Sequence, residues 1–221
     1  MNNICIIPAR GGSTRIPNKN IKDFKGSPII SYSINTARES GLFDRIIVST
    51  DSKEIADVAR EYGAEIHYRS AEMSENEVGT QAVVKNVLEE LEIENGLVCC
   101  IYATSPLMST EDLSHAKDVL TYQNDGQLDY AFSVGATPLC DAGQFYMGWA
   151  KAFIKEVPLI GDNTAMIPIS DDRVCDINTP EDWARAEKMY AVLHEHQYKL
   201  IPNDIPELVH FRCDCGHGLP T

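Results

Sequence analysis

The 221-residue sequence predicts an α/β fold, with a mainly parallel, twisted sheet and helices on both of its faces. Two observations lead to this fold class. Short apolar runs rich in β-branched residues recur along the chain, and helix-like segments separate most of them. No stretch rich in Pro, Gly and Ser resembles an interdomain linker, and the length suits one sizeable core. The expected strands are Ile4–Ile7, Arg45–Ser49, Glu65–Tyr68, Leu97–Tyr102 and Tyr130–Val134.

Capping signals predict where three helices begin, because an oxygen-bearing side chain stands three residues before a carboxylate. The pairs are Asp51 with Glu54, Ser109 with Asp112, and Thr179 with Asp182. We expect Asp51 to serve chiefly as a helix cap, and Pro180 to occupy the first turn of the last helix. That helix repeats apolar residues at spacings of three and four, which predicts a face that packs on the sheet. They are Trp183, Ala186, Tyr190 and Leu193.

The segment after the first expected strand combines two glycines with three cations. Gly11 and Gly12 allow the backbone to come close to a ligand and expose its N–H groups. The cations are Arg10, Arg15 and Lys19. The Rossmann and P-loop glycine patterns are both absent, so a polyphosphate would be held here by a different device. An ordinary basic loop remains the alternative interpretation.

The charge of the whole chain limits its partners. Acidic residues outnumber basic ones by 33 to 19, and a formal net charge of −14 argues against nucleic acids and anionic membranes as partners. An acidic protein that binds a triphosphate needs local cations and a hard divalent ion such as Mg²⁺. Neither a signal peptide nor a run of about 20 apolar residues is visible, so we expect a cytoplasmic protein.

The seven cysteines do not suggest a disulfide framework. Cys5, Cys99 and Cys100 fall in apolar runs, where a thiol behaves as a small hydrophobic group. Near the end of the chain, Cys213 and Cys215 stand close to a histidine, but their spacing is not that of a zinc module. We expect residues 1–200 to form the domain and residues 201–221, rich in Pro and Gly, to form an irregular tail.

Five segments should meet at one edge of the sheet, because ligands of open α/β sheets bind beyond the carboxyl ends of the strands. These segments are the basic loop, Thr50–Asp51, Arg69, Ala103–Pro106 and Asp176–Asn178. The sequence therefore predicts a single ligand site at this edge.

A set of motifs, found in a fixed order up to about Tyr190, carries a family resemblance. The motifs are Ile6–Ser13, Pro17–Asn20, Gly41–Asp44, Val48–Asp51, Ile101–Pro106, Asp141–Tyr146 and Asp176–Trp183. Together they resemble the CMP-sialic acid synthetase (acylneuraminate cytidylyltransferase) family, and most closely its pseudaminic acid cytidylyltransferase branch. The resemblance implies a Rossmann-like nucleotide-diphospho-sugar transferase fold and a homodimer. It also implies transfer of CMP from CTP to an acidic nine-carbon sugar, with release of pyrophosphate and with Mg²⁺ as cofactor.

The resemblance further implies which residues form the site. The nucleotide-binding residues are Ala9, Arg10, Gly11, Gly12, Ser13, Lys19, Asn20, Arg69 and Thr80. The catalytic residues are Arg10, Arg15, Lys19 and Asp176, and the metal ligands are Asp176 and Asn178. The sugar-binding residues are Tyr102, Thr104, Ser105, Gln144 and Tyr146. Structural interpretations remain open, with Arg69 as a surface cation, Asp176 in an ordinary turn, and the sugar-binding candidates as parts of turns or strands.

Three departures from the family pattern fall near the proposed chemistry. Thr14 stands where the family usually has lysine, and Asn178 replaces the second aspartate of Asp-x-Asp, which should weaken binding of Mg²⁺. Only Gly135–Cys140 separates Val134 from Asp141, where the family has a few tens of residues that contribute to sugar binding and to the dimer arm. We expect the fold to survive, whereas full activity stays open, and the assembly is either the family's homodimer or an altered or monomeric form. The alternatives are a non-catalytic nucleotide-binding homologue, or the same chemistry on legionaminic or neuraminic acid.

Overall fold

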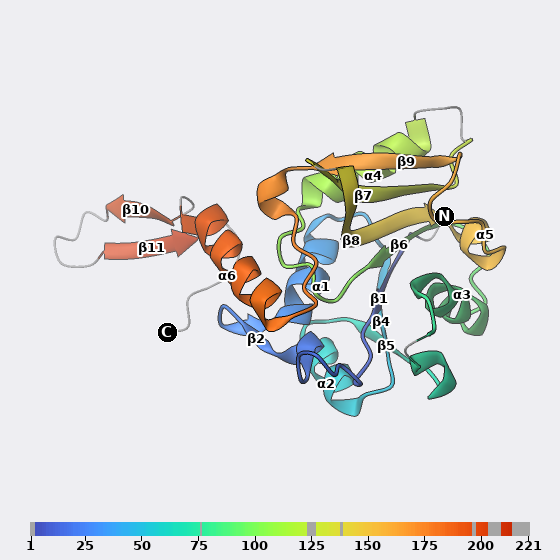
Figure 1. Cartoon of the computed structure of the whole chain (residues 1–221), viewed down its shortest axis with the longest axis horizontal. Coiled ribbons are helices and arrows are strands. Elements are labelled where there is room, and N and C mark those ends of the chain that lie inside the picture. Colours follow the sequence, from blue (N-terminus) through green and yellow to red (C-terminus); the bar gives the residue numbers. More distant parts are fainter. Residues whose placement is uncertain are drawn as a thin grey trace.

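A seven-stranded sheet forms the centre of the structure, in the order β5-β4-β1-β6-β8-β7-β9 (Figure 1). The computed structural model describes residues 3–75, 77–122, 127–137 and 139–195, with the backbone of 198–202 and 209–213. Only β8 runs antiparallel to its neighbours in this sheet, so the prediction of a mainly parallel sheet is confirmed. The strands are β1 Ile4–Pro8, β4 Arg45–Thr50, β5 Glu65–Tyr68, β6 Leu97–Ile101, β7 Tyr130–Ala136, β8 Leu139–Trp149 and β9 Thr164–Ile169.

Helices cover both faces of this sheet, as the sequence predicts (Figure 1). Side chains alternate along a strand, so Cys5 and Ile7 of β1 pack with α1, α2 and α4, whereas Ile4 and Ile6 pack with α3 and α5. The helices are α1 Ile29–Glu39, α2 Lys53–Glu61, α3 Thr80–Glu90, α4 Thr110–Tyr122, α5 Ala150–Ile154 and α6 Pro180–Glu195. The short elements are η1 Lys19–Ile21, β2 Asp23–Phe24, β3 Ser27–Pro28, η2 Glu72–Ser74 and η4 Asp171–Arg173.

Two of the three predicted helix caps are confirmed. Ser109 N donates to Asp112 Oδ2 at 3.1 Å, and Asp112 N donates back to Ser109 Oγ at 3.3 Å. Thr179 and Asp182 make the equivalent pair at the start of α6, where Thr179 N donates to Asp182 Oδ2 at 2.9 Å. Reciprocal bonds of this kind satisfy N–H groups that have no partner inside the helix.

The expectation that Asp51 caps α2 is wrong. The cap lies one residue later, where Ser52 has an extended backbone and its Oγ accepts from Ile55 N at 3.3 Å. The Asp51 carboxylate instead accepts from Gly11 N at 2.9 Å. A short polar side chain at either position can satisfy a free helix N–H, so spacing alone did not decide between them.

The last helix packs differently from the prediction. Trp183 and Ala186 are buried, with Tyr190 and Leu193 partly buried, but their neighbours include Phe24 of β2 and residues of α1. The apolar face therefore stabilises the N-terminal segment and not the seven-stranded sheet. The helical periodicity shows that a face is buried, but it does not specify the surface that buries it.

The chain between Val134 and Asp141 forms the end of a β-hairpin. Strand β7 continues to Ala136, β8 begins at Leu139, and Gly135 pairs with Cys140 in an antiparallel register. The segment Asp141–Tyr146 therefore lies inside β8. The sequence does not predict β9, because Pro168 within it argues against a central strand. The strand forms because β9 lies at the edge of the sheet, where proline is tolerated.

Two further sequence expectations concern the cysteines and the tail. Cys5, Cys99 and Cys100 are buried in β1 and β6, and burial raises the pKa of each thiol, as expected for apolar core residues. The tail was expected to be irregular, whereas β10 (Tyr198–Pro202) and β11 (Val209–Cys213) pair as an antiparallel hairpin. Tyr, Ile, Leu, Val and Phe favour strands there. The metal candidates Cys213, Cys215 and His217 lie outside the described side chains.

Among the described helices, none has the length and apolar character that a transmembrane span requires.

Candidate active site

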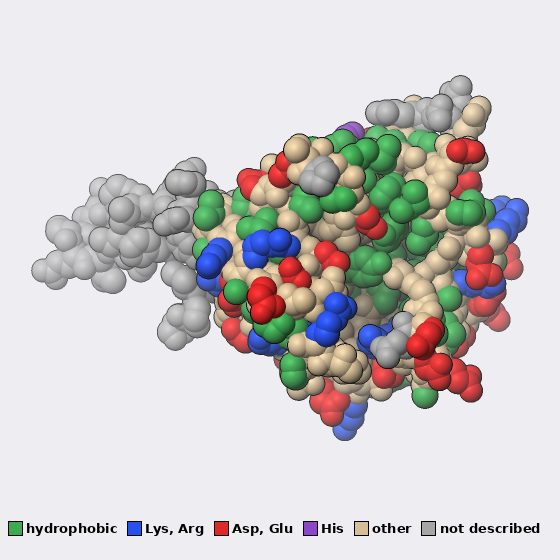
Figure 2. All heavy atoms as spheres, in the orientation of Figure 1, with side chains coloured by type: hydrophobic (Ala, Val, Ile, Leu, Met, Phe, Trp, Pro, Cys, Tyr) green, Lys and Arg blue, Asp and Glu red, His purple; other side chains and the backbone are tan. Residues whose placement is uncertain are grey.

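A cavity of about 230 Å³ opens at the carboxyl ends of β1, β5 and β6, where the sequence predicts the ligand site. Figure 2 shows Lys and Arg side chains beside a hollow in this face of the molecule. Four of the five predicted segments reach the cavity, whereas Thr50 and Asp51 do not line it. The lining residues are Pro8, Arg10, Ser13, Thr14, Arg15, Lys19, Asn20, Arg69, Val78, Thr80, Val83, Tyr102, Ala103, Thr104 and Asn178.

The loop after β1 is held by bonds to its own backbone and to β4. Ala9 N donates to Ser49 O at 2.9 Å, and the Asn20 side chain donates to Arg10 O at 2.9 Å. A Cβ at Gly11 would lie 3.0 Å from Ser52 Cβ, so a side chain there would require Ser52 to move by a few tenths of an ångström. Its N–H is bonded to Asp51 within the protein, whereas a Cβ at Gly12 would meet no atom within 4 Å. Gly11 therefore packs closely within the protein, whereas Gly12 faces open space.

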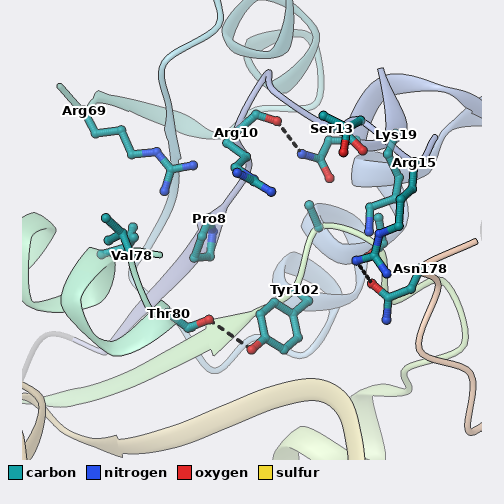
Figure 3. Close-up of a pocket in the computed structure, with 15 residues that line it drawn as sticks. Pro8, Arg10, Ser13, Arg15, Lys19, Arg69, Val78, Thr80, Tyr102 and Asn178 are labelled. Carbon is teal, nitrogen blue, oxygen red and sulfur yellow. Dashed lines mark hydrogen bonds between the residues drawn. The ribbon is translucent and has the colours of Figure 1, made fainter. Parts of the chain in front are cut away.

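Four cationic side chains surround the cavity, namely Arg10, Arg15, Lys19 and Arg69 (Figure 3). Two of them also reach the segment before α6. Lys19 Nζ donates to Ile177 O at 2.7 Å, and Arg15 Nη2 donates to Asn178 Oδ1 at 3.0 Å. Parts of the chain that are more than 150 residues apart thus form one wall, because the sheet topology brings both to the same edge.

Burial and repulsion between neighbouring cations lower the pKa of Lys19 and of Arg69. Burial lowers the pKa of Lys19, and the neighbouring Arg15 and Arg10 lower it further, against the opposing effect of Asp176. Burial also lowers the pKa of Arg69, which is 8% exposed and whose Nε has no hydrogen-bond partner among the described residues. Partly desolvated cations gain more from an anionic ligand than solvated ones do. The cavity therefore suits a polyanion such as a triphosphate.

Thr80 and Tyr102 lie together on another wall of the cavity (Figure 3). Their hydroxyl oxygens are 3.0 Å apart, and burial raises the pKa of Tyr102 to about 12, so its hydroxyl stays protonated near neutral pH. Val78 and Val83 add apolar surface next to Thr80. The sequence analysis predicts neither valine, because it places no helix start at Thr80, where α3 begins.

Two of the five sugar-binding candidates, Tyr102 and Thr104, line the cavity, and the other three are engaged within the fold. Ser105 is buried and donates to Gln144 O at 3.3 Å. Gln144 is 2% exposed, and its Nε2 donates to Arg173 O at 2.7 Å. Tyr146 is also buried and its hydroxyl donates to Asp141. Ser105 and Gln144 therefore hold backbone around the site, and Tyr146 holds the Asp141 side chain.

Asn178 lines the cavity on the α6 side, whereas Asp176 does not line it. The amide nitrogen of Asn178 donates to the exposed carboxylate of Asp176, which places this carboxylate beside the cavity. Within the described part of the chain, no group of three or more His, Cys, Asp or Glu side chains is arranged to hold a metal ion. A cation bound here would need ligands from a bound molecule as well as from the protein.

Comparison with known proteins identifies the family. A family model described as cytidylyltransferase matches residues 4–143. The chain belongs to this cytidylyltransferase family. Pseudaminic acid cytidylyltransferase of Campylobacter jejuni is 37% identical over 90% of this chain and 100% of its own length. The CMP-N,N'-diacetyllegionaminic acid synthase of Legionella pneumophila is 28% identical over 87% of this chain and 97% of its own. The resemblance stated from the motifs is thereby confirmed.

A solved structure also matches this cytidylyltransferase. The CMP:2-keto-3-deoxy-manno-octonic acid synthetase complexed with CTP has a TM-score of 0.71 at 14% identity, over 87% of this chain and 100% of that one. This likeness confirms the predicted fold.

The alignment with the Campylobacter jejuni relative bears on the missing segment. It runs over 232 residues although it covers only 90% of this 221-residue chain, so the relative carries residues that this chain lacks. The resemblance places the family's longer segment at the β7–β8 hairpin, where Ala136 pairs with Leu139 in this chain. A hairpin needs few connecting residues, which explains how the sheet closes without that segment.

Proposed function

We propose that this cytidylyltransferase transfers CMP from CTP to pseudaminic acid and releases pyrophosphate. The observation that supports this most strongly is the convergence of Arg10, Arg15, Lys19 and Arg69 with the Asp176–Asn178 segment on one cavity. Pseudaminic acid is favoured over legionaminic acid because the relative named for the first acid is 37% identical, against 28% for the second.

In this proposal the cations hold the triphosphate during the reaction. Attack on the α-phosphate increases the negative charge on its oxygens and on the departing pyrophosphate. Arg10, Arg15 and Lys19 stabilise that charge from fixed positions, since the loop that carries them is bonded to β4 and to the segment before α6. Val78 and Val83 offer an apolar wall for the nucleoside.

The side chains of Asp176 and Asn178 fit a hard divalent cation. Asp176 offers a carboxylate and Asn178 an amide oxygen, and Mg²⁺ is commonly held by one or two such groups together with substrate phosphates. When bound, Mg²⁺ would neutralise charge on the phosphate oxygens. Arg15 already donates to Asn178 Oδ1, so this amide also fixes the position of the guanidinium.

The acceptor and the partners complete the proposal. Tyr102 and Thr104 line the cavity and would contact the sugar acid, whose anomeric hydroxyl attacks the α-phosphate. CTP and the sugar acid are the proposed partners, and the net charge of −14 argues against nucleic acids and anionic membranes as partners. The cytoplasmic location stays a prediction. The homodimer stays a prediction from the family resemblance. The segment that would form the dimer arm is shortened in this chain.

Release of pyrophosphate tests the function directly. Purified protein is supplied with CTP and Mg²⁺, and with pseudaminic, legionaminic or neuraminic acid in separate assays. We expect release to depend on the acid and to be fastest with pseudaminic acid. Faster release with another acid would reassign the acceptor. Binding of CTP without release under any condition would show a non-catalytic homologue and overturn the proposal.

A further inference from the structure

The segment that carries Asp176 and Asn178 contains little regular structure of its own. Strand β9 ends at Ile169 and α6 begins at Pro180, with only the short helix η4, Asp171–Arg173, between them. Backbone of this kind is held in place by its contacts with neighbouring elements. In Figure 1 this orange segment lies beside β7 and α4.

Arg173 ties η4 to two different elements. Its guanidinium forms a two-pronged ion pair with Asp112 of α4, in which Nη2 donates to Oδ1 at 2.9 Å and Nη1 donates to Oδ2. Asp112 is 7% exposed and also caps its own helix, so its position is fixed. The Arg173 carbonyl accepts from Gln144 Nε2 of β8 at 2.7 Å. A guanidinium and carboxylate paired in this way are fixed in orientation as well as distance.

Asp171 ties the other end of η4 to the shortened hairpin. Its Oδ1 accepts from the backbone N–H groups of Ala136 at 3.0 Å and of Thr137 at 3.2 Å, at the end of β7. The carboxylate is exposed and thus reaches the hairpin from outside the core. The connection that is short in this chain is therefore bonded directly to the segment that leads to Asp176.

The contacts of Asp176 continue this arrangement. Gly143 of β8 has a φ of 63°, and a Cβ built on it would lie 3.4 Å from Asp176 Cγ, so the carboxyl group rests against the hairpin backbone. On the other side, Asp182 Oδ2 accepts from Asn178 N at 3.1 Å. Asp176 is thus located between an anchored η4 and the capped start of α6.

We propose that Arg173 and Asp171 are positioning residues that hold Asp176 where it can bind a divalent cation with CTP. This inference rests on the proposed function. A site with one carboxylate and one amide oxygen has few ligands of its own. Its affinity for a divalent cation therefore depends on how firmly these ligands are oriented. Side chains that orient metal ligands commonly change affinity by about 10- to 100-fold when they are substituted.

Binding of Mn²⁺ in the presence of CTP tests the inference without turnover, because no sugar acid is added. Electron paramagnetic resonance measures free Mn²⁺, and thermal melting monitors the fold. We expect Arg173→Lys, which keeps the charge but loses the two-pronged pairing, to weaken Mn²⁺ binding by about tenfold. Arg45→Lys is the matched control, since Arg45 makes a comparable pair with Glu65 at the other end of β4. We expect it to leave Mn²⁺ binding unchanged.

A second pair of variants covers the case in which Arg173→Lys fails to fold. Asp171→Ala removes the contact with the hairpin, and Asp172→Ala removes the same charge from the neighbouring exposed position. We expect only Asp171→Ala to weaken Mn²⁺ binding, with metal-free CTP affinity unchanged. Equal effects within both pairs, or no effect of either test variant, would overturn the inference. Wild-type protein that binds neither CTP nor Mn²⁺ would instead overturn the proposed function.

Discussion

The loop after β1 and the segment before α6 form facing parts of one cavity, but they are stabilised in different ways. The loop brings three cations from a stretch of ten residues and is bonded to its own backbone, to β4 and to the segment before α6. The segment before α6 brings one carboxylate and one amide. Its position depends on side chains of α4 and β8 and on backbone N–H groups of the hairpin. The nucleotide side therefore takes most of its charge from one short stretch of sequence, whereas the metal side has few ligands and is positioned by several elements.

The two sides should therefore respond differently to substitution. Changes within the loop should alter the affinity for CTP, because its cations act on the phosphates directly. Changes around Asp176 should alter the dependence on metal more than the affinity for metal-free CTP.

Asp176→Asn should produce the largest loss, because it removes the carboxylate proposed to bind the metal. We expect the rate of pyrophosphate release to fall by a factor on the order of 10²–10³, the scale for losing one preorganised charged group. Asp172→Asn makes the same change at a nearby exposed position and should retain the wild-type rate. Retained activity in Asp176→Asn would show that the carboxylate does not serve the reaction.

Lys19→Met should mainly weaken binding of CTP. The ammonium group lines the cavity and donates to Ile177 O, so its loss removes a charge-assisted contact with phosphate and one bond between the two walls. We expect an affinity loss of about 10- to 100-fold by calorimetry, the range for a hydrogen bond to a charged group. Lys22→Met is the control, since Lys22 lies over the Trp183 ring. Equal losses in both variants would argue against a specific role for Lys19.

Restoring the two residues of the family pattern should strengthen binding of the phosphates at position 14 and of the metal at position 178. Thr14 and Asn178 both line the cavity, so Thr14→Lys adds an ammonium group and Asn178→Asp adds a carboxylate near Asp176. We expect the double variant to reach half-maximal activity at about tenfold lower Mg²⁺, because a second charged ligand strengthens a site with one. If neither the rate nor the Mg²⁺ requirement improves, our interpretation of these positions is wrong.

The affinity for CTP should fall as the pH rises toward the alkaline range. Burial lowers the pKa of Lys19, so its ammonium group in the free protein loses its proton at a lower pH than an exposed lysine does. Phosphate favours the charged form, so binding weakens as the pH rises through that pKa. Calorimetry between pH 7 and 10 measures this decline, and Lys19→Arg should remove it, because a guanidinium stays charged throughout. An identical decline in both proteins would exclude Lys19 as its source.

Six of the nine nucleotide-binding residues that the resemblance implies line the cavity, whereas Ala9, Gly11 and Gly12 do not. Arg10, Lys19 and Arg69 line the cavity as expected, because cations in loops at the carboxyl ends of parallel strands converge there. Gln144 and Tyr146 belong to the predicted motif but are turned into the fold, and that direction depends on the register of β8 with its neighbours. Strand register and long-range bonds are set by tertiary packing and cannot be obtained from local spacing.

The same limit explains the errors at the edges of the site. Asp51 matches a capping signal, yet Gly11 approaches closely enough to use its carboxylate instead. The apolar face of α6 was expected on the sheet, although Phe24 and α1 cover it. In each case the sequence identifies a group that needs a partner, and the tertiary structure places that group against a partner other than the expected one.

A calorimetric comparison of the affinities for CTP, CDP, CMP and cytidine tests whether the cations around this cavity hold a triphosphate. Each ligand is titrated into wild-type protein at one fixed ionic strength. We expect the affinity to fall with each phosphate removed, by about tenfold or more per step, because each step loses a charge-assisted contact. Cytidine or CMP that binds as tightly as CTP would contradict it, because the cations would then contribute nothing to recognition of the phosphates.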